Sequence, residues 1–125
     1  MSGAPPGLAR AAILVLEDDY YLAEDLLRTL EEAGATVLGP CPGPAEAERL
    51  IEGRRPDCAF LDLNLGGGPS FDFPRALTRA GIPFAFVTGY DRQAIPDEFA
   101  AVERLEKPVE PRNVVAVAAR LLGES

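Results

Sequence analysis

The sequence predicts an α/β fold in which helices cover both faces of a parallel sheet. Short apolar runs rich in branched residues alternate along the chain with amphipathic stretches of helical period. The apolar runs lack polar alternation, as strands buried on both faces of a parallel sheet require. We therefore predict a doubly wound sheet built from five strand–helix units.

The first half of the chain supplies two of these units. The apolar run at 11–16 is a predicted buried strand, and 20–33 is a predicted amphipathic helix that ends at Gly34. A second strand is predicted at 35–38, followed by a helix at 43–53. Two cysteines flank this region: we expect Cys58 to lie in the core and Cys41, between two prolines, to lie in a loop.

The second half continues the alternation. Strands are predicted at 57–63 and 83–87, with a weaker one at 102–105. Helices are predicted at 70–80, where Gly81 ends the helix, and from Pro111 onward.

The fourth helical stretch is interrupted. Pro96 lies in the middle of 91–100 and pushes Ile95 out of helical space, so we expect a short helix that begins at Pro96.

Composition narrows the possible functions. A chain of 125 residues is long enough for one packed domain, which we place at 10–123, after a Gly-, Pro- and Ser-rich tail at 1–9 that we expect to be flexible. The net charge of −8, with no histidine, disfavours binding to nucleic acid or to an anionic membrane. No secretory signal or membrane-spanning run is visible, so we expect a cytoplasmic protein.

Charged side chains gather where the predicted strands end. Glu17 and Asp18 follow the first strand, Asp62 ends the third, and Lys107 follows the fifth. If the first and third strands are neighbours, the three carboxylates converge, and each pair at 4 Å costs about 4 kcal/mol at an effective dielectric constant near 20. Lys107 supplies one compensating charge, and a divalent cation would supply two more. Oxygen-only ligands favour a hard ion such as Mg²⁺.

Each of these residues also has an ordinary structural explanation. Acidic residues after a strand suit a helix N-terminus, an aspartate before glycines suits a turn, and most lysines are solvated. The joint pattern, with each residue at the end of its own strand, favours a site.

Four segments resemble the receiver domain of response regulators in bacterial two-component signalling. They are "ILVLEDD", "CAFLDLNLGG", "FVTGY" and "LEKPVEP", and the resemblance extends from about Arg10 to Leu122. It implies a flavodoxin-like (βα)5 fold with strand order 2-1-3-4-5. The "PFAFVTGY" stretch resembles the motif of an alphaproteobacterial subgroup of receivers, which is named for its Phe-Ala-Thr-Gly sequence. This chain has Val87 where that motif has alanine. Many members of that subgroup are single-domain proteins, as we expect here.

The resemblance implies roles for the acidic residues. Asp62 matches the phosphoacceptor, and Asp18 the direct Mg²⁺ ligand. Glu17 matches the acid that usually acts on the metal through water, and Asn64 the residue that gives it a backbone carbonyl. The strand end would hold an Asp62 oxygen in line for attack on phosphorus, and Gly66–Gly68 would leave the approach open. A phosphate-cradling loop is the alternative for these glycines, although no G-K-[ST] helix follows.

The resemblance also implies the residues that bind the phosphoryl group. Thr88 matches the hydroxyl that bonds it and Lys107 the lysine that pairs with it, with a cis bond from Lys107 to Pro108. The phosphodonor would be a sensor histidine kinase or a phosphotransfer protein, and the output an interaction with a downstream protein. We expect a monomer or weak dimer whose only chemistry is its own phosphorylation and dephosphorylation.

The switch departs from the family pattern. Most receivers carry an aromatic residue three positions before the lysine, where this chain has Arg104. We predict that phosphorylation pulls Thr88, reorders the chain through Gly89 and repositions Tyr90, while Arg104 stays on the surface as a partner contact. Alternatively, Tyr90 only packs against the neighbouring helix.

Two other functions compete with the phosphorylation switch. A Mg²⁺-dependent phosphatase with an aspartate nucleophile would want a second acid two residues on, where this chain has Asn64. A receiver-like scaffold would signal without phosphorylation, although the complete set of site residues counts against it.

Overall fold

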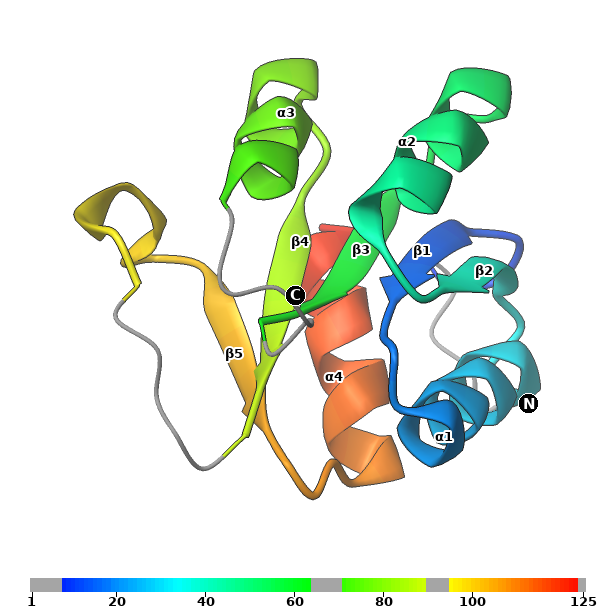
Figure 1. Cartoon of the computed structure of the whole chain (residues 1–125). Coiled ribbons are helices and arrows are strands. Elements are labelled where there is room, and N and C mark those ends of the chain that lie inside the picture. Colours follow the sequence, from blue (N-terminus) through cyan, green and yellow to red (C-terminus); the bar gives the residue numbers. More distant parts are fainter. Residues whose placement is uncertain (1–7, 64–70, 90–94, 124–125) are drawn as a thin grey trace.

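A computed structural model describes residues 8–63, 71–89 and 95–123, and its sheet has the predicted strand order. Five parallel strands lie in the order β2-β1-β3-β4-β5, which confirms the flavodoxin-like α/β fold (Figure 1). The strands are β1 (Ala12–Leu16), β2 (Thr36–Cys41), β3 (Cys58–Asp62), β4 (Phe84–Thr88) and β5 (Glu103–Glu106). The α-helices of the described residues are α1 (Tyr20–Glu32), α2 (Pro44–Gly53), α3 (Asp72–Ala80) and α4 (Pro111–Leu121).

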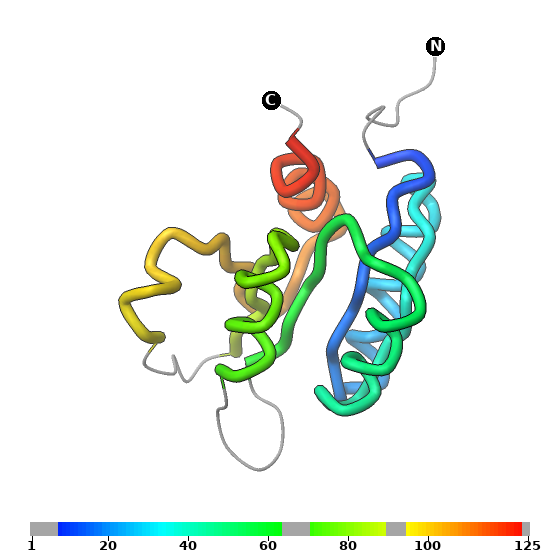
Figure 2. The backbone as a smooth tube through the Cα atoms, turned by 90° about the horizontal axis from the view of Figure 1, so that it is seen from above, coloured from blue at the N-terminus to red at the C-terminus, as the bar shows by residue number. Residues whose placement is uncertain are grey.

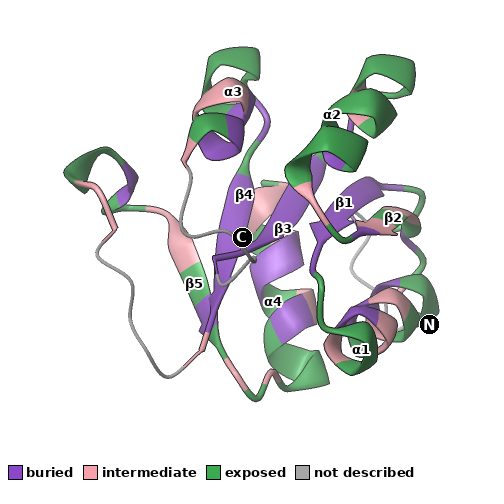
Figure 3. Ribbon diagram, in the orientation of Figure 1, coloured by how far each residue is buried: buried purple, intermediate pink, exposed green. Residues whose placement is uncertain are grey.

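The sheet separates two apolar layers. Alternate residues of the central strands, such as Val15 and Phe60, pack with α1 and α4 on one face. Their neighbours, such as Leu61 and Phe86, pack with α2 and α3 on the other. Every residue of β1, β3 and β4 is buried, whereas the edge strands β2 and β5 are partly exposed (Figure 3). This burial explains why the central strands are apolar at successive positions.

Local signals position α1 and α3. The side chain of Asp19 caps α1 by accepting a hydrogen bond of 3.1 Å from the backbone N–H of Leu22. Gly81 ends α3 in the left-handed conformation, with φ of 75°, as the sequence predicts. The cap fixes where the chain turns from β1 into α1, immediately after the acidic residues.

The second strand is longer than predicted. It runs to Cys41, which pairs with Leu16 and is buried, so the prediction that Cys41 lies in a loop is wrong. Cys58 lies in the core as predicted. The strand continues because Gly39, at φ of +101°, lets the chain approach β1 closely. A Cβ there would lie 2.9 Å from the carbonyl oxygen of Val15.

The segment before β5 also differs from the prediction. The short helix expected from Pro96 is a single 3-10 turn, η1 (Asp97–Phe99), with Pro96 preceding it as the cap residue. Phe99 is buried in the α2/α3 layer, so packing of this side chain holds the turn. From the sequence alone we could not predict that one buried aromatic side chain would anchor this segment to the core in place of the apolar face of a helix.

The packed part of the chain begins before residue 10. Leu8, which the sequence placed in the tail, is fully buried in the α1/α4 layer, and the N–H of Arg10 donates to the carbonyl of Gly34. Across residues 8–63, 71–89 and 95–123, no helix is both long and apolar enough to cross a membrane.

Candidate phosphoacceptor site

The carboxyl ends of neighbouring strands bring the predicted acidic residues together. Glu17 directly follows β1, Asp62 ends β3, and these two strands are adjacent in the sheet. One carboxylate oxygen from each of Glu17, Asp18 and Asp62 lies within 4.8 Å of the others. Glu17 and Asp62 are buried, whereas Asp18 is exposed at the rim. The arrangement can hold one cation against two buried carboxylates and one solvated carboxylate.

Backbone contacts fix the Glu17 side chain. Its own N–H donates to the carbonyl of Cys41 at 2.9 Å, which continues the pairing of β1 with β2. Its Oε2 accepts a hydrogen bond of 3.0 Å from the N–H of Asp19. Its Oε1 is buried without a hydrogen-bond partner among the described residues. A buried carboxylate oxygen in this position is suited to a cation or to a water that a cation holds.

Lys107 directly follows the edge strand β5 and reaches the same cluster from the carboxyl end of that strand. Its Nζ lies 3.4 Å from Oδ1 of Asp62 and 3.6 Å from Oε2 of Glu17. Its backbone N–H donates to the carbonyl of Thr88 at 2.8 Å, which extends the pairing of β4 with β5. The bond from Lys107 to Pro108 is cis. The lysine is thus held by backbone at one end and by the carboxylates at the other.

Burial changes the protonation of the cluster. Loss of water, followed by the neighbouring Asp62 carboxyl, raises the pKa of Glu17 to about 8. The same two causes raise the pKa of Asp18 above its ordinary value. Glu17 and Asp18 therefore hold their protons more tightly than free carboxyl groups do, and a bound cation would displace those protons.

The remaining predicted site residues divide between described and undescribed parts of the chain. Thr88 is buried at the end of β4, and Gly89 follows it with partial exposure. Asn64 and Tyr90 lie outside the described residues.

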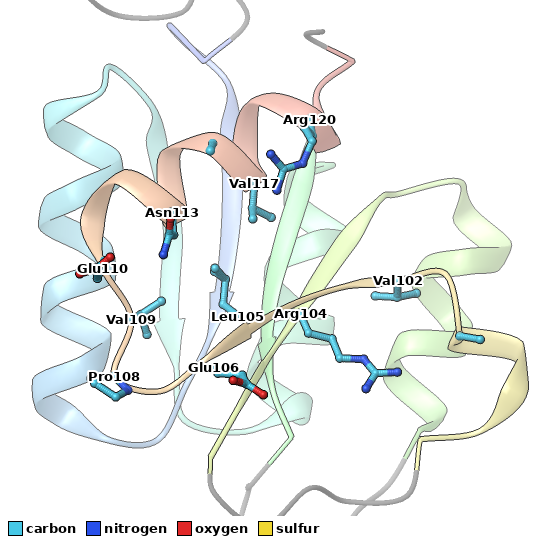
Figure 4. Close-up of a pocket in the computed structure, with 12 residues that line it drawn as sticks. Val102, Arg104, Leu105, Glu106, Pro108, Val109, Glu110, Asn113, Val117 and Arg120 are labelled. Carbon is cyan, nitrogen blue, oxygen red and sulfur yellow. The ribbon is translucent and has the colours of Figure 1, made fainter.

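Arg104 is exposed on β5, next to Phe86 of β4 in the register of the sheet. Figure 4 shows Arg104 and Glu106 directed away from α4, whereas Leu105 points toward it. These residues line a groove of about 870 Å³ along the β5 edge and α4.

Sequence reasoning missed two contacts near this edge. Arg120 of α4 makes a bidentate ion pair with Glu103 of β5, and Arg75 of α3 makes one with Glu98 of η1. The partners are 17 and 23 residues apart, so no local pattern marks them.

Several known proteins are similar to this chain, although no protein-family model matches it. The chain is 33% identical over 119 residues to the phyllosphere-induced regulator PhyR of Methylorubrum extorquens, covering 88% of this chain and 43% of PhyR. Among solved structures, SdrG from Sphingomonas melonis Fr1 is 32% identical, with a TM-score of 0.78 and coverage of 98% and 99%. A response regulator receiver protein from Burkholderia phymatum shares the fold, with a TM-score of 0.80, 21% identity and coverage of 93% and 98%.

The fold, the acidic cluster at the strand ends and these likenesses define one class of protein, the response-regulator receiver domains. This chain belongs to that family. Within it, the chain is related to the alphaproteobacterial PhyR proteins. It spans about half the length of the curated relatives it matches first.

Proposed function

We propose that this protein is a phosphorylation-switched signalling receiver whose Asp62 accepts a phosphoryl group from the phosphohistidine of a sensor kinase or a phosphotransfer protein. The observation that carries the proposal is the position of Asp62, buried at the end of β3 with an ammonium group 3.4 Å from its Oδ1. A rigid strand end limits the motion of the attacking oxygen, which favours an in-line approach.

The proposed step exchanges one bond to phosphorus for another. An Asp62 carboxylate oxygen bonds to phosphorus while the P–N bond of the donor breaks. The imidazole nitrogen leaves with the electron pair and takes up a proton from solvent. Asp62 becomes an acyl phosphate, and the Lys107 ammonium and Thr88 hydroxyl donate to the oxygens of the transferred group.

The site also suits Mg²⁺. Glu17, Asp18 and Asp62 would hold the ion, together with the backbone carbonyl that the family resemblance assigns to Asn64. When bound, the ion would neutralise negative charge on the transferring phosphoryl group. The buried Oε1 of Glu17 and the oxygen-only set of side chains support this assignment.

The output would be an interaction with another protein. The groove along β5 and α4 offers a surface next to Lys107, and Arg104 on its rim would contact the partner. The net charge of −8 disfavours nucleic acid as that partner. A cytoplasmic location follows from the proposed kinase partnership.

Reaction with a small phosphodonor tests the proposal. The protein is incubated with phosphoramidate and Mg²⁺, and its intact mass is followed with time. We expect one added phosphoryl group in the wild type and none in Asp62→Asn, which keeps the shape of the side chain. Steady release of phosphate without an adduct would instead indicate a phosphatase, and no reaction would indicate a scaffold.

A further inference from the structure

The 95–102 segment, which leads into β5, is held against α3 by two kinds of contact. Figure 2 shows it as the yellow stretch that curves out beside the green α3. Its buried side chain is Phe99, only 2% exposed. Its charged anchor is Glu98, which accepts from Arg75 of α3 at 3.1 Å and 2.9 Å in a bidentate pair. Asp72, also on α3, lies 3.8 Å from the same guanidinium group.

Aromatic packing makes the second connection. The ring of Phe99 stacks on Phe71, with centroids 5.6 Å apart and an interplanar angle of 27°. It meets Phe86 edge-on at 5.7 Å, and Phe86 in turn meets Phe71 edge-on at 6.3 Å. These three rings join the residue before α3, the centre of β4 and the 3-10 turn in one cluster.

The segment has little regular structure of its own. Its backbone bonds are those of a short turn: Phe99 N–H to Pro96, Ala100 N–H to Asp97 and Val102 N–H to Phe99. A single turn is intrinsically weak. Its position therefore depends mainly on the contacts that α3, Phe71 and the sheet provide, and it is suited to two states, docked and released.

Both sides of this contact are close in sequence to the proposed phosphoacceptor site. Phe86 lies two residues before Thr88 on β4, and Ile95 lies seven residues after Thr88. Because Phe86 contacts both Phe71 and Phe99, a shift of Thr88 at the end of β4 would reach the ring cluster through Phe86. The structure shows the segment docked, with both anchors made, so a disturbance of these contacts would favour the released state.

We propose that the Phe71–Phe99 stack and the Arg75–Glu98 pair form a latch that phosphorylation of Asp62 opens, freeing the 95–102 segment beside the β5 edge. This inference rests on the proposed function. The latch carries the signal along the α3 side of the sheet, and it requires neither an aromatic residue at position 104 nor a change in α4.

Amide hydrogen exchange of the full chain, measured by NMR with phosphoramidate and Mg²⁺ present or absent, tests the latch. The reporters are the amides of Phe99, Ala100 and Val102, and the reference is the core amide of Ala59, bonded to Pro83. We expect phosphorylation of the wild type to speed exchange at the three reporters at least threefold and to leave Ala59 unchanged. Arg75→Gln and Glu98→Gln should show fast reporter exchange before phosphorylation, with little further increase.

The chain offers a matched control. Arg120 and Glu103 form an equally bidentate pair, with bonds of 2.7 Å and 2.9 Å, on the α4 side of β5. Arg120→Gln should therefore keep both the slow exchange and the full response. Phe71→Leu, which removes the stack but leaves the ion pair, should behave like Arg75→Gln.

The latch and the proposed function can fail separately. If the wild type is phosphorylated and the reporters stay unchanged or slow down, the latch is refuted while the proposed function stands. The latch is also refuted if Arg75→Gln responds like the wild type, or if Arg120→Gln loses the response equally. If no phosphoryl group is taken up, the proposed function fails and the inference falls with it.

Discussion

The ammonium group of Lys107 lies 3.4 Å from Oδ1 of Asp62, across a separation of 45 residues in sequence. Lys107 is the one lysine in a chain with eleven arginines. An ammonium group is a compact charge that can follow a moving anion, whereas a guanidinium group favours a fixed planar pair, as at Arg75 and Arg120. The residue type at position 107 thus suits a partner that changes from a carboxylate to a phosphoryl group.

Replacing Lys107 should destabilise the protein most at alkaline pH. Lys107→Met removes the ammonium group beside two buried carboxylates, so we expect a loss of about 1–3 kcal/mol at pH 8.5. The loss should shrink at pH 5, where Glu17 is protonated in the folded protein. Urea unfolding at the two pH values measures both. Lys107→Arg, which keeps the charge, is the control, and an equal loss at both pH values would contradict the prediction.

Removing Asp18 should separate metal binding from folding. Asp18→Ala deletes the exposed member of the acidic cluster, so we expect Mg²⁺ to bind at least tenfold more weakly. The metal-free protein should melt at the same or a higher temperature, because one repulsive charge is gone. Mg²⁺ should stabilise the wild type by about 2.7 kcal/mol at one hundred times its dissociation constant.

Asp25→Ala provides the control for this experiment. Asp25 lies on α1, the helix that follows Asp18 in the chain, where it pairs with Arg28 at 3.6 Å in a solvated ion pair. Its removal should leave the Mg²⁺ response intact. If metal-free Asp18→Ala melts at a lower temperature than the metal-free wild type, repulsion within the acidic cluster does not destabilise the folded protein, and the prediction is wrong.

Metal-free stability should fall as the pH rises from about 4.5 to 8. The pKa of Glu17 is raised to about 8 in the folded protein from 4.5, so the folded state holds an extra proton across this interval. Stability falls with pH wherever the folded state binds more protons, by up to about 1.4 kcal/mol for each pKa unit. Thermal melting in EDTA tests this, and Glu17→Gln should flatten the dependence. A wild-type profile that rises over this interval would be incompatible with a protonated Glu17.

The switch predicted from the sequence requires a separate comparison. Tyr90→Ala should weaken the phosphorylation-dependent NMR shifts of residues 95–102, whereas Arg104→Ala should leave them and weaken partner binding only. Arg104 is exposed, so its truncation should change the free energy of unfolding by less than about 0.5 kcal/mol. If Tyr90→Ala responds like the wild type and Arg104→Ala abolishes the response, the signal travels through β5 instead.

Much of the fold follows from local patterns. The continuous apolar runs of β1, β3 and β4 predict central strands because a strand covered on both faces has no place for a polar side chain. Gly34 and Gly81 predict the ends of α1 and α3. Edge elements were harder to predict. The strand β2 continues through a glycine and a proline to the buried Cys41, and only the pairing of Cys41 with Leu16 of β1 explains this continuation.

The sequence by itself determined which residues could form the site, since Glu17, Asp18, Asp62, Thr88 and Lys107 each stand at the end of a recognisable strand. Only the tertiary structure decided how they differ. It buries Glu17 and leaves Asp18 in solvent, although the two residues are adjacent in sequence. The reason is that the backbone hydrogen bond from Glu17 to Cys41 extends the pairing of β1 with β2 by one residue, and this pairing stops before Asp18. It also brings Arg75 to Glu98 and Phe71 to Phe99. Such contacts depend on how helices lie across a sheet, and this arrangement is set by the packing of the whole core rather than by any local run of residues.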